Sequence, residues 1–220
     1  MLVEYLRNVP IFSHLKESRI REMASMCKSV FFKKGEIVFH TTDISTDLYV
    51  VVAGRLKAVL IDDAGAEIVL SHFKEGDFFG ELSLIDGRGR SATIVADEDS
   101  ELAFLRRDVF LDLLLKDSKI AVEMMITLVS RMRKADELIE SLAFLEVSER
   151  LMNTLLDIAK IEGHDHEGGR RIGKLTHKEL AGRIGSSREA VSKCMKIFVS
   201  KGIIKEAGDY FILIPPNTNL

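Results

Sequence analysis

The chain has 220 residues, of which 46% are hydrophobic and 30% are charged, which is typical of a soluble protein with one large domain or two smaller ones. Its two cysteines, Cys27 and Cys194, are far apart, which argues against a disulfide framework and a cysteine-ligated iron–sulfur cluster. No apolar run approaches the roughly eighteen residues of a membrane span, and charges interrupt the N-terminal apolar run, unlike in a signal peptide. We therefore expect a cytoplasmic protein with no membrane partner.

The formal net charge of −3 conceals an asymmetry along the chain. Residues 170–205 include ten basic and two acidic side chains, a local charge of +8 that leaves −11 for the rest. A basic segment in an acidic chain predicts a polyanionic partner such as nucleic acid. A solvated helical surface is the alternative interpretation.

The first half of the chain changes from a helical to a strand-like pattern. Residues 1–27 carry apolar side chains at helical spacing, among them Ile20, Met23 and Cys27. Residues 29–106 contain short apolar runs separated by turn-forming segments at Gly35, Gly54, 62–65 and 74–77. This regular punctuation predicts a small barrel or roll of about eight strands.

A glycine-punctuated segment, residues 79–93, interrupts these strands and carries Gly80, Glu81, Arg90 and Ser91. Such a loop can turn backbone N–H groups toward an anion, while an arginine fork holds a phosphate and a carboxylate binds sugar hydroxyls. The alternative is structural, with Glu81 and Arg90 pairing only with each other.

From Arg107 to about Ala143 the pattern is helical throughout. A seam with strict spacing of three and four residues runs along this segment, and Asp136 is its one polar member. The seam predicts a parallel homodimer helix, and a long helix packed on its own barrel is the alternative. Its residues are Val122, Met125, Val129, Met132, Asp136, Ile139 and Ala143.

Beyond a hinge at 141–147, the sequence predicts a compact helical unit that ends in a β-hairpin. An amphipathic helix over Glu149–Ile161 precedes a polar loop at 162–169. The loop contains His164, Asp165 and His166, but three adjacent loop residues rarely enclose a metal ion. We interpret the loop as solvated and predict no metal site.

Two short helices joined by a tight turn at Gly185 predict a helix-turn-helix unit. Thr176 begins the first helix, with Glu179 completing a capping box, and the second helix opens near Ser187. Arginine can bind guanine O6 and N7, glutamate can accept from cytosine N4, and serine or lysine can bind phosphate. Residues 201–205 and 210–214 predict a two-stranded wing. The predicted DNA-binding residues are Thr176, Ser187, Arg188, Glu189, Ser192 and Lys193.

The order of phosphate-binding segment, long helix, hinge and winged helix-turn-helix resembles the cyclic-AMP receptor protein/FNR superfamily of bacterial transcription regulators. Leu142–Val147 resembles the hinge of this family, and Ser187–Lys193 resembles its recognition-helix motif, with Lys193 where the family has arginine. An altered preference at one base pair is therefore expected. The resemblance implies an α+β fold with a sensory domain at 1–115, a dimerisation helix at 116–142 and a DNA-binding domain at 143–220.

The same resemblance implies a non-enzymatic regulator that binds double-stranded DNA as a homodimer and contacts RNA polymerase, with the loop 162–169 as a candidate contact. The allosteric effector would be a cyclic nucleotide, cyclic AMP or cyclic GMP. Glu81 would bind the ribose, and Arg90 and Ser91, with backbone N–H groups near Gly80 and Leu82, would bind the phosphate. The implied ligand-binding residues are Phe79, Gly80, Glu81, Leu82, Ser83, Arg90, Ser91, Ala135 and Asp136.

Base recognition departs from the family pattern, because Ala135-Asp136 stands where the family has Thr-Ser. A carboxylate cannot donate to adenine N1, but it can accept from two N–H groups of guanine, so we hypothesise a preference for a guanine nucleotide. The alternatives are a solvated Asp136, another effector, or DNA binding without a nucleotide. A haem sensor using His14, His40 or His72 is a weaker alternative, because surface or core histidines are more common.

Overall fold

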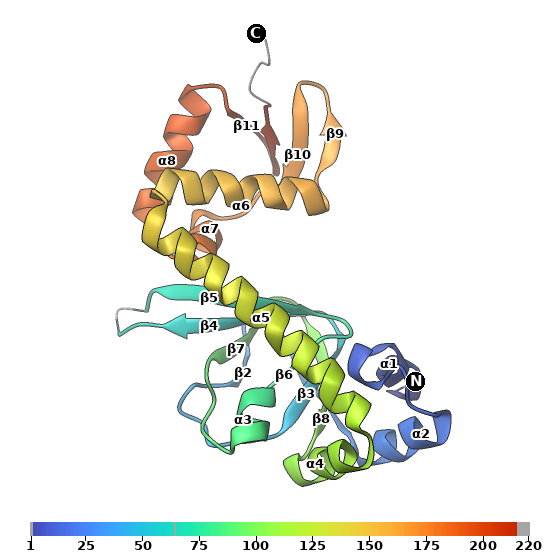
Figure 1. The fold of residues 1–220 in the computed structure, drawn as a ribbon. Coiled ribbons are helices and arrows are strands. Elements are labelled where there is room, and N and C mark those ends of the chain that lie inside the picture. Colours follow the sequence, from blue (N-terminus) through green and yellow to red (C-terminus); the bar gives the residue numbers. More distant parts are fainter. Residues whose placement is uncertain (1, 64, 215–220) are drawn as a thin grey trace. The chain divides into compact units, whose positions relative to one another are not determined.

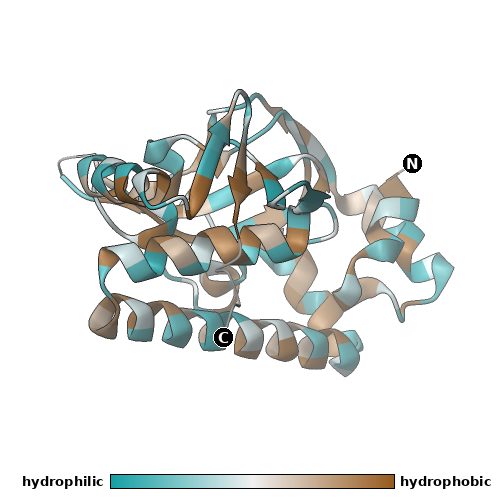
Figure 2. Ribbon diagram, turned by 90° about the horizontal axis from the view of Figure 1, so that it is seen from above, coloured by the Kyte–Doolittle hydropathy of each residue, from teal (hydrophilic) through white to brown (hydrophobic). Residues whose placement is uncertain are grey.

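The computed structural model describes residues 2–63 and 65–214, and it contains both helices and sheets, which confirms the predicted α+β class (Figure 1). The chain forms two compact units. The first comprises residues up to 60 and 70–135, and the second comprises residues 61–69 and 136–220. The helices of both units mix apolar and polar residues, so each can bury one side and expose another (Figure 2).

Short helices open the first unit, and eight strands follow them. Helices α1 (Leu2–Asn8) and α2 (Glu17–Met26) flank a 3₁₀ turn, η1 (Pro10–Phe12). The strands form two four-stranded sheets with the orders β1-β8-β3-β6 and β2-β7-β4-β5, which confirms the predicted roll. They are β1 (Lys28–Phe32), β2 (Ile37–Phe39), β3 (Leu48–Ala53), β4 (Arg55–Ile61), β5 (Glu67–Lys74), β6 (Phe78–Phe79), β7 (Thr93–Ala96) and β8 (Ser100–Leu105).

Two apolar clusters hold this unit together. One joins the flanking helices to the first sheet through Leu6, Phe12, Leu48 and Phe110, all fully buried. The other fills the roll with aromatic side chains, and the rings of Tyr49 and Phe79 stack 5.3 Å apart. Burial of these large side chains is the main stabilising contribution to the unit.

The glycine-punctuated segment contains a helix that the sequence did not predict. Helix α3 (Glu81–Asp86) follows β6 directly, and the glycines on either side, Gly80 and Gly87, have left-handed φ angles of 86° and 72°. The two glycines therefore begin and end a short helix, where the sequence predicted a continuous loop. The helix places Glu81 at its first turn, beside β6.

The predicted continuous helix from Arg107 is wrong at one point, because Asp117 separates α4 (Arg107–Lys116) from α5 (Ser118–Phe144). Asp117 has an extended backbone, and its carboxylate accepts a hydrogen bond from the N–H of Lys119 at 3.0 Å, so it caps the next helix. Helix α5 buries Ile120 and Met124 in the core of the first unit. The predicted seam residues are exposed: Val122, Met125, Val129, Met132, Asp136, Ile139 and Ala143.

The second unit combines three helices with a sheet. Its elements are α6 (Val147–Glu162), β9 (His164–His166), β10 (Gly169–Gly173), α7 (His177–Ile184), α8 (Arg188–Ser200), β11 (Ile204–Ala207) and β12 (Tyr210–Leu213). The strands form one antiparallel sheet in the order β11-β12-β10-β9. The predicted polar loop is thus partly a strand pair, and the unit is not purely helical before its terminal hairpin. The predicted wing, β11 and β12, is confirmed.

The turn between α7 and α8 is tightly packed. Gly185 has φ +58°, and a Cβ atom there would lie 2.8 Å from a methyl group of Leu142, near the end of α5. Arg150 donates to the carbonyl oxygens of Leu145 at 3.0 Å and Gly185 at 3.5 Å. Through these contacts, the segment between α5 and α6 packs against the turn of the helix-turn-helix.

Candidate nucleotide-binding and DNA-binding sites

One cavity in the roll brings together all the residues predicted from the glycine-punctuated segment: Phe79, Gly80, Glu81, Leu82, Ser83, Arg90 and Ser91. The remaining walls come from the sheets and from α5, through Phe39, Ala58, Phe73, Ala92, Ile94 and Arg131. Ser83 closes the segment on itself, because its hydroxyl donates to the carbonyl of Gly89 at 3.1 Å. The cavity therefore combines aromatic walls with two arginines and one carboxylate.

Arg90 is buried in this cavity with only 5% of its surface exposed. Its guanidinium donates to three neutral acceptors: Ser45 Oγ from Nε at 3.0 Å, the Gly80 carbonyl from Nη1 at 3.1 Å and the Asp47 carbonyl from Nη2 at 3.0 Å. The guanidinium carbon also lies 4.0 Å from the ring centre of Phe39.

No carboxylate among the described residues forms an ion pair with Arg90, although arginine keeps its charge in proteins. Burial lowers the pKa of Arg90, and negative groups nearby, Asp47 among them, oppose this effect. A buried cation without a counter-ion is costly unless an anion joins it.

Glu81 pairs with Arg131 of α5 and not with Arg90, so the structural alternative of a Glu81–Arg90 pair is wrong. Arg131 Nη1 lies 2.8 Å from Glu81 Oε1, and Nη2 donates to the carbonyl of Phe78. Glu81 Oε2 has no hydrogen-bond partner among the described residues. Sequence reasoning missed Arg131, which lies beside seam residue Met132 but lines the cavity; its contact with Glu81 spans 50 positions and follows no local pattern.

The volume of the cavity is about 60 Å³. Pockets that enclose a ligand of drug size measure about 300–1,000 Å³. The donor and acceptor set fits a phosphate and a sugar, but a whole nucleotide requires the walls to move apart. Arg131, with a quarter of its side-chain surface exposed, is more exposed than its ion-pair partner Glu81.

Ala135 and Asp136, predicted to contact the base, are exposed on α5 and are not part of the cavity wall. Their predicted role requires a second copy of the chain and stays a prediction.

The recognition helix α8 presents three of its predicted DNA-binding side chains free of internal partners. Arg188, Glu189 and Lys193 are exposed and form no side-chain hydrogen bond or ion pair with other described residues. Val191, Met195 and Phe198 are buried as predicted and fix the helix against the core of its unit. The free side chains lie in the N-terminal half of α8, the end that enters the major groove in helix-turn-helix proteins.

The other predicted DNA-binding residues also hold local structure. Thr176 Oγ1 accepts from the N–H of Glu179 at 3.2 Å in the predicted capping box, and Ser187 Oγ accepts from the N–H of Ala190 at 3.1 Å. Ser192 is half-buried, and its Oγ donates to the Arg188 carbonyl and lies 2.8 Å from Nδ1 of His177, a contact that the sequence did not predict.

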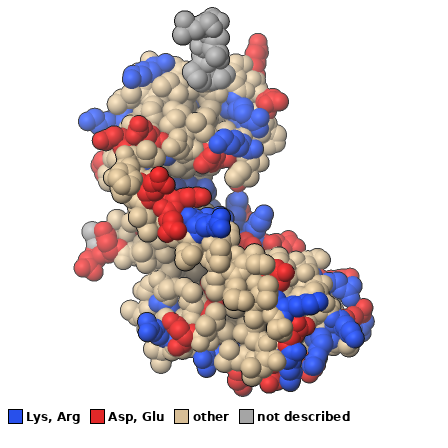
Figure 3. Space-filling view, in the orientation of Figure 1, with Lys and Arg blue, Asp and Glu red and all other residues tan. Residues whose placement is uncertain are grey.

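Part of the basic excess is used inside the second unit. Arg170 donates to the carbonyl oxygens of Ala159 and Gly163 at the end of α6, and Lys174 pairs with Glu206 at 3.1 Å. On the face seen in Figure 3, basic side chains lie among acidic ones and do not form one continuous patch. The local charge of this segment therefore overstates the number of groups free to bind phosphate.

The described residues contain no cluster of three His, Cys, Asp or Glu side chains that could hold a metal ion. Two histidines of the sensory half lie at ion-pair distance from aspartates: His14 from Asp117 and His72 from Asp97, both at 3.4 Å. Across the described ranges, no helix is long and apolar enough to cross a bilayer.

Comparisons with known proteins agree with this geometry. Residues 29–117 match the cyclic nucleotide-binding domain, and residues 149–216 match the Crp-like helix-turn-helix domain. The chain belongs to the cyclic-AMP receptor protein/FNR superfamily. It is thus a DNA-binding transcription regulator with a cyclic nucleotide-binding domain, as the resemblance implied.

Relatives in this superfamily match along most of their length. The cyclic AMP receptor protein of Thermus thermophilus is 29% identical over 200 residues, covering 91% of this chain and 90% of that protein. The cAMP-activated global transcriptional regulator Vfr of Pseudomonas aeruginosa is 28% identical over 203 residues, covering 90% and 94%. The c-di-GMP responsive global regulator CLP of Xanthomonas campestris has a similar structure, with a TM-score of 0.81 at 25% identity, covering 91% of this chain and 100% of that one.

Proposed function

We propose that this regulator binds a cyclic nucleotide, cyclic AMP or cyclic GMP, in the cavity of its first unit, and that the ligand changes its affinity for DNA. The observation that carries the proposal is the buried guanidinium of Arg90, which has no ion-pair partner among the described residues. A cyclic phosphate supplies the missing negative charge, and charge-assisted hydrogen bonds of this kind are among the strongest in proteins.

The sugar half of the ligand is assigned to Glu81. Its free oxygen, Oε2, can accept a hydrogen bond from a ribose hydroxyl while Oε1 stays paired with Arg131. Relatives named for cyclic AMP support an adenine nucleotide, and the neighbour named as responsive to c-di-GMP supports a guanine base. The carboxylate of Asp136 also suits guanine, so clearly tighter binding of cyclic AMP than of cyclic GMP would refute a guanine preference.

The functional form is a homodimer that joins along α5. Five exposed apolar side chains of this helix lie within the first unit, and a second copy would bury them: Val122, Met125, Ile126, Val129 and Met132. A dimer presents two recognition helices to successive turns of the major groove. RNA polymerase is a further partner, and segment 162–169, which contains β9, is its candidate contact.

Binding of the nucleotide acts by selecting one arrangement of the dimer. The ligand can shift that equilibrium only by its difference in affinity for the two arrangements. In DNA, Arg188 and Glu189 are assigned to base edges, so substitution of Arg188 should relax base preference. Substitution of Lys201, an exposed residue at the end of α8, should mainly change the dependence of binding on salt.

The test is a DNA-binding measurement with and without a panel of cyclic nucleotides. The variant Arg90→Leu should lose the nucleotide response, whereas the matched control Arg88→Leu should keep it, because 87% of the Arg88 side-chain surface is exposed. An unchanged response in Arg90→Leu would count decisively against the phosphate assignment.

A second candidate function is DNA binding without a nucleotide. The internal Glu81–Arg131 pair and the small cavity favour it, since the site is partly satisfied by the chain itself. In that case wild-type protein would bind DNA equally well with every nucleotide and with none.

A further inference from the structure

Arg90 is held from outside its own segment by the loop 40–47, which joins β2 to β3. Ser45 Oγ occupies the single N–H of Nε, and the Asp47 carbonyl occupies one of the two on Nη2. The Gly80 carbonyl occupies one of the two on Nη1. A guanidinium has five N–H donors, so one remains on each terminal nitrogen.

We propose that Ser45 is a positioning residue that determines how Arg90 binds the phosphate of the ligand, an inference that rests on the proposed function. A guanidinium can grip two oxygens through Nε and one terminal nitrogen, or through its two terminal nitrogens. The hydroxyl of Ser45 blocks the first mode by accepting from Nε. The two N–H groups that remain are both on terminal nitrogens, so Ser45 directs the phosphate to the terminal nitrogens and away from Nε.

The plane of the guanidinium is fixed as well. The ring of Phe39 covers one face of Arg90, with the guanidinium carbon 4.0 Å from the ring centre. Rotation of the guanidinium about the side-chain bonds of Arg90 would break its hydrogen bond to Ser45 and move it off the Phe39 ring. Ser45 and Phe39 together therefore keep the guanidinium in one orientation before the ligand arrives, which reduces the ordering cost of binding.

The loop has other attachments that do not depend on Ser45. The N–H of Arg90 donates to the Asp43 carbonyl at 3.1 Å, and the N–H of Thr41 donates to Thr93 Oγ1 at 3.3 Å. The N–H of His40 donates to the Asp43 carboxylate at 2.9 Å. Removing the Ser45 hydroxyl should therefore leave the loop in place and change only the freedom of Arg90.

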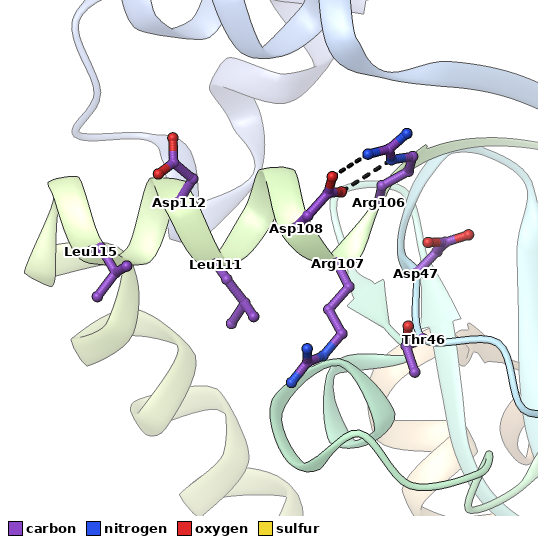
Figure 4. Close-up of a pocket in the computed structure, with 8 residues that line it drawn as sticks. All are labelled: Thr46, Asp47, Arg106, Arg107, Asp108, Leu111, Asp112 and Leu115. Atoms are coloured by element: carbon purple, nitrogen blue, oxygen red, sulfur yellow. Dashed lines mark hydrogen bonds and ion pairs between the residues drawn. The ribbon is translucent and has the colours of Figure 1, made fainter.

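The neighbouring residue provides a matched control. Thr46 lines a separate hollow of about 540 Å³ beside α4, together with Asp47, Arg106 and Leu111 (Figure 4). The Thr46 hydroxyl forms no hydrogen bond with Arg90, whose three acceptors are Ser45, Gly80 and Asp47. Thr46→Ala removes a hydroxyl from the same loop without touching the guanidinium.

The experiment is calorimetric titration of the full chain with cyclic AMP and cyclic GMP. Ser45→Ala should weaken binding by roughly five- to tenfold, because the freed Arg90 side chain must then be ordered when the ligand binds. Thr46→Ala should change it less than about twofold, and Ser45→Thr, which keeps the hydroxyl, should stay close to wild type. Thermal unfolding of each variant shows whether a loss of affinity follows a loss of structure.

A second background separates positioning from a general structural effect. In Arg90→Lys the ammonium lacks the planar fork, so adding Ser45→Ala should produce no further loss of affinity. An equal loss in both backgrounds, or equal affinities of Ser45→Ala and Thr46→Ala, would overturn the inference while leaving the proposed function intact. If wild-type protein binds neither nucleotide, the proposed function fails and the inference fails with it.

Discussion

Glu81 and Arg131 form an ion pair, and substituting one member should destabilise the protein more than substituting the other. Only 6% of the Glu81 side-chain surface is exposed, against 25% for Arg131. Replacing Arg131 by Met leaves a deeply buried carboxylate without its partner. Removing one partner of a buried pair costs about 3–5 kcal/mol, and we expect about 3 kcal/mol because water reaches Arg131.

The reverse change should cost less. In Glu81→Gln the amide oxygen still accepts from Arg131, which also keeps its bond to the Phe78 carbonyl and its contacts with the rings of Phe73 and Phe78. We expect the free energy of unfolding to fall by about 1–2 kcal/mol, because one charge-assisted hydrogen bond becomes a neutral one.

The assay is urea unfolding of the full chain, with Arg133→Met as the matched control. Arg133 is an exposed arginine of the same helix, and its substitution should cost less than about 0.5 kcal/mol. An Arg131→Met variant as stable as Arg133→Met, or a larger loss in Glu81→Gln than in Arg131→Met, would refute the reasoning.

Three further substitutions test the turn at Gly80, the cap at Thr176 and the exposed seam of α5. Gly80→Ala should destabilise the protein by about 2 kcal/mol and weaken nucleotide binding. At φ +86°, the added Cβ would lie 2.6 Å from Arg90 Nη1 and 2.8 Å from the Asp47 carbonyl. Urea unfolding and nucleotide titration would detect the two effects, and wild-type values in both would contradict the prediction. Thr176→Ala should cost about 1 kcal/mol in unfolding measurements through loss of its capping bond, whereas no loss would show that the cap contributes nothing. Met132→Glu should shift a homodimer toward monomer in sedimentation experiments by placing two carboxylates in the seam, and an unchanged distribution would place the dimer contact elsewhere.

The elements with a strong local signal were predictable from the sequence. Thr176 and Glu179 form the capping box that their spacing predicted, and the residues facing inward from α8 are buried as the helical period required. The eight strands of the roll follow the punctuation by turn residues. In each case neighbouring residues carry the whole pattern.

The missed features lack a local hydrophobic signal or depend on distant residues. Strand β9 is polar, because His164 and Asp165 are exposed, so no alternation of apolar residues marks it. The break at Asp117 was missed because the helical period continues across it. The bonds of Arg90 to Ser45 and of Arg131 to Glu81 span 45 and 50 positions, and only the fold brings these residues together.

The most direct test of the central claim is the affinity of the full chain for a cyclic nucleotide, measured by calorimetry for wild type, Arg88→Leu and Arg90→Leu. Wild type and Arg88→Leu should bind alike, and Arg90→Leu should bind at least roughly 30-fold more weakly, since a buried charge loses its partner. Equal binding by Arg90→Leu and wild type, with both proteins folded, would contradict the assignment of Arg90 to the phosphate.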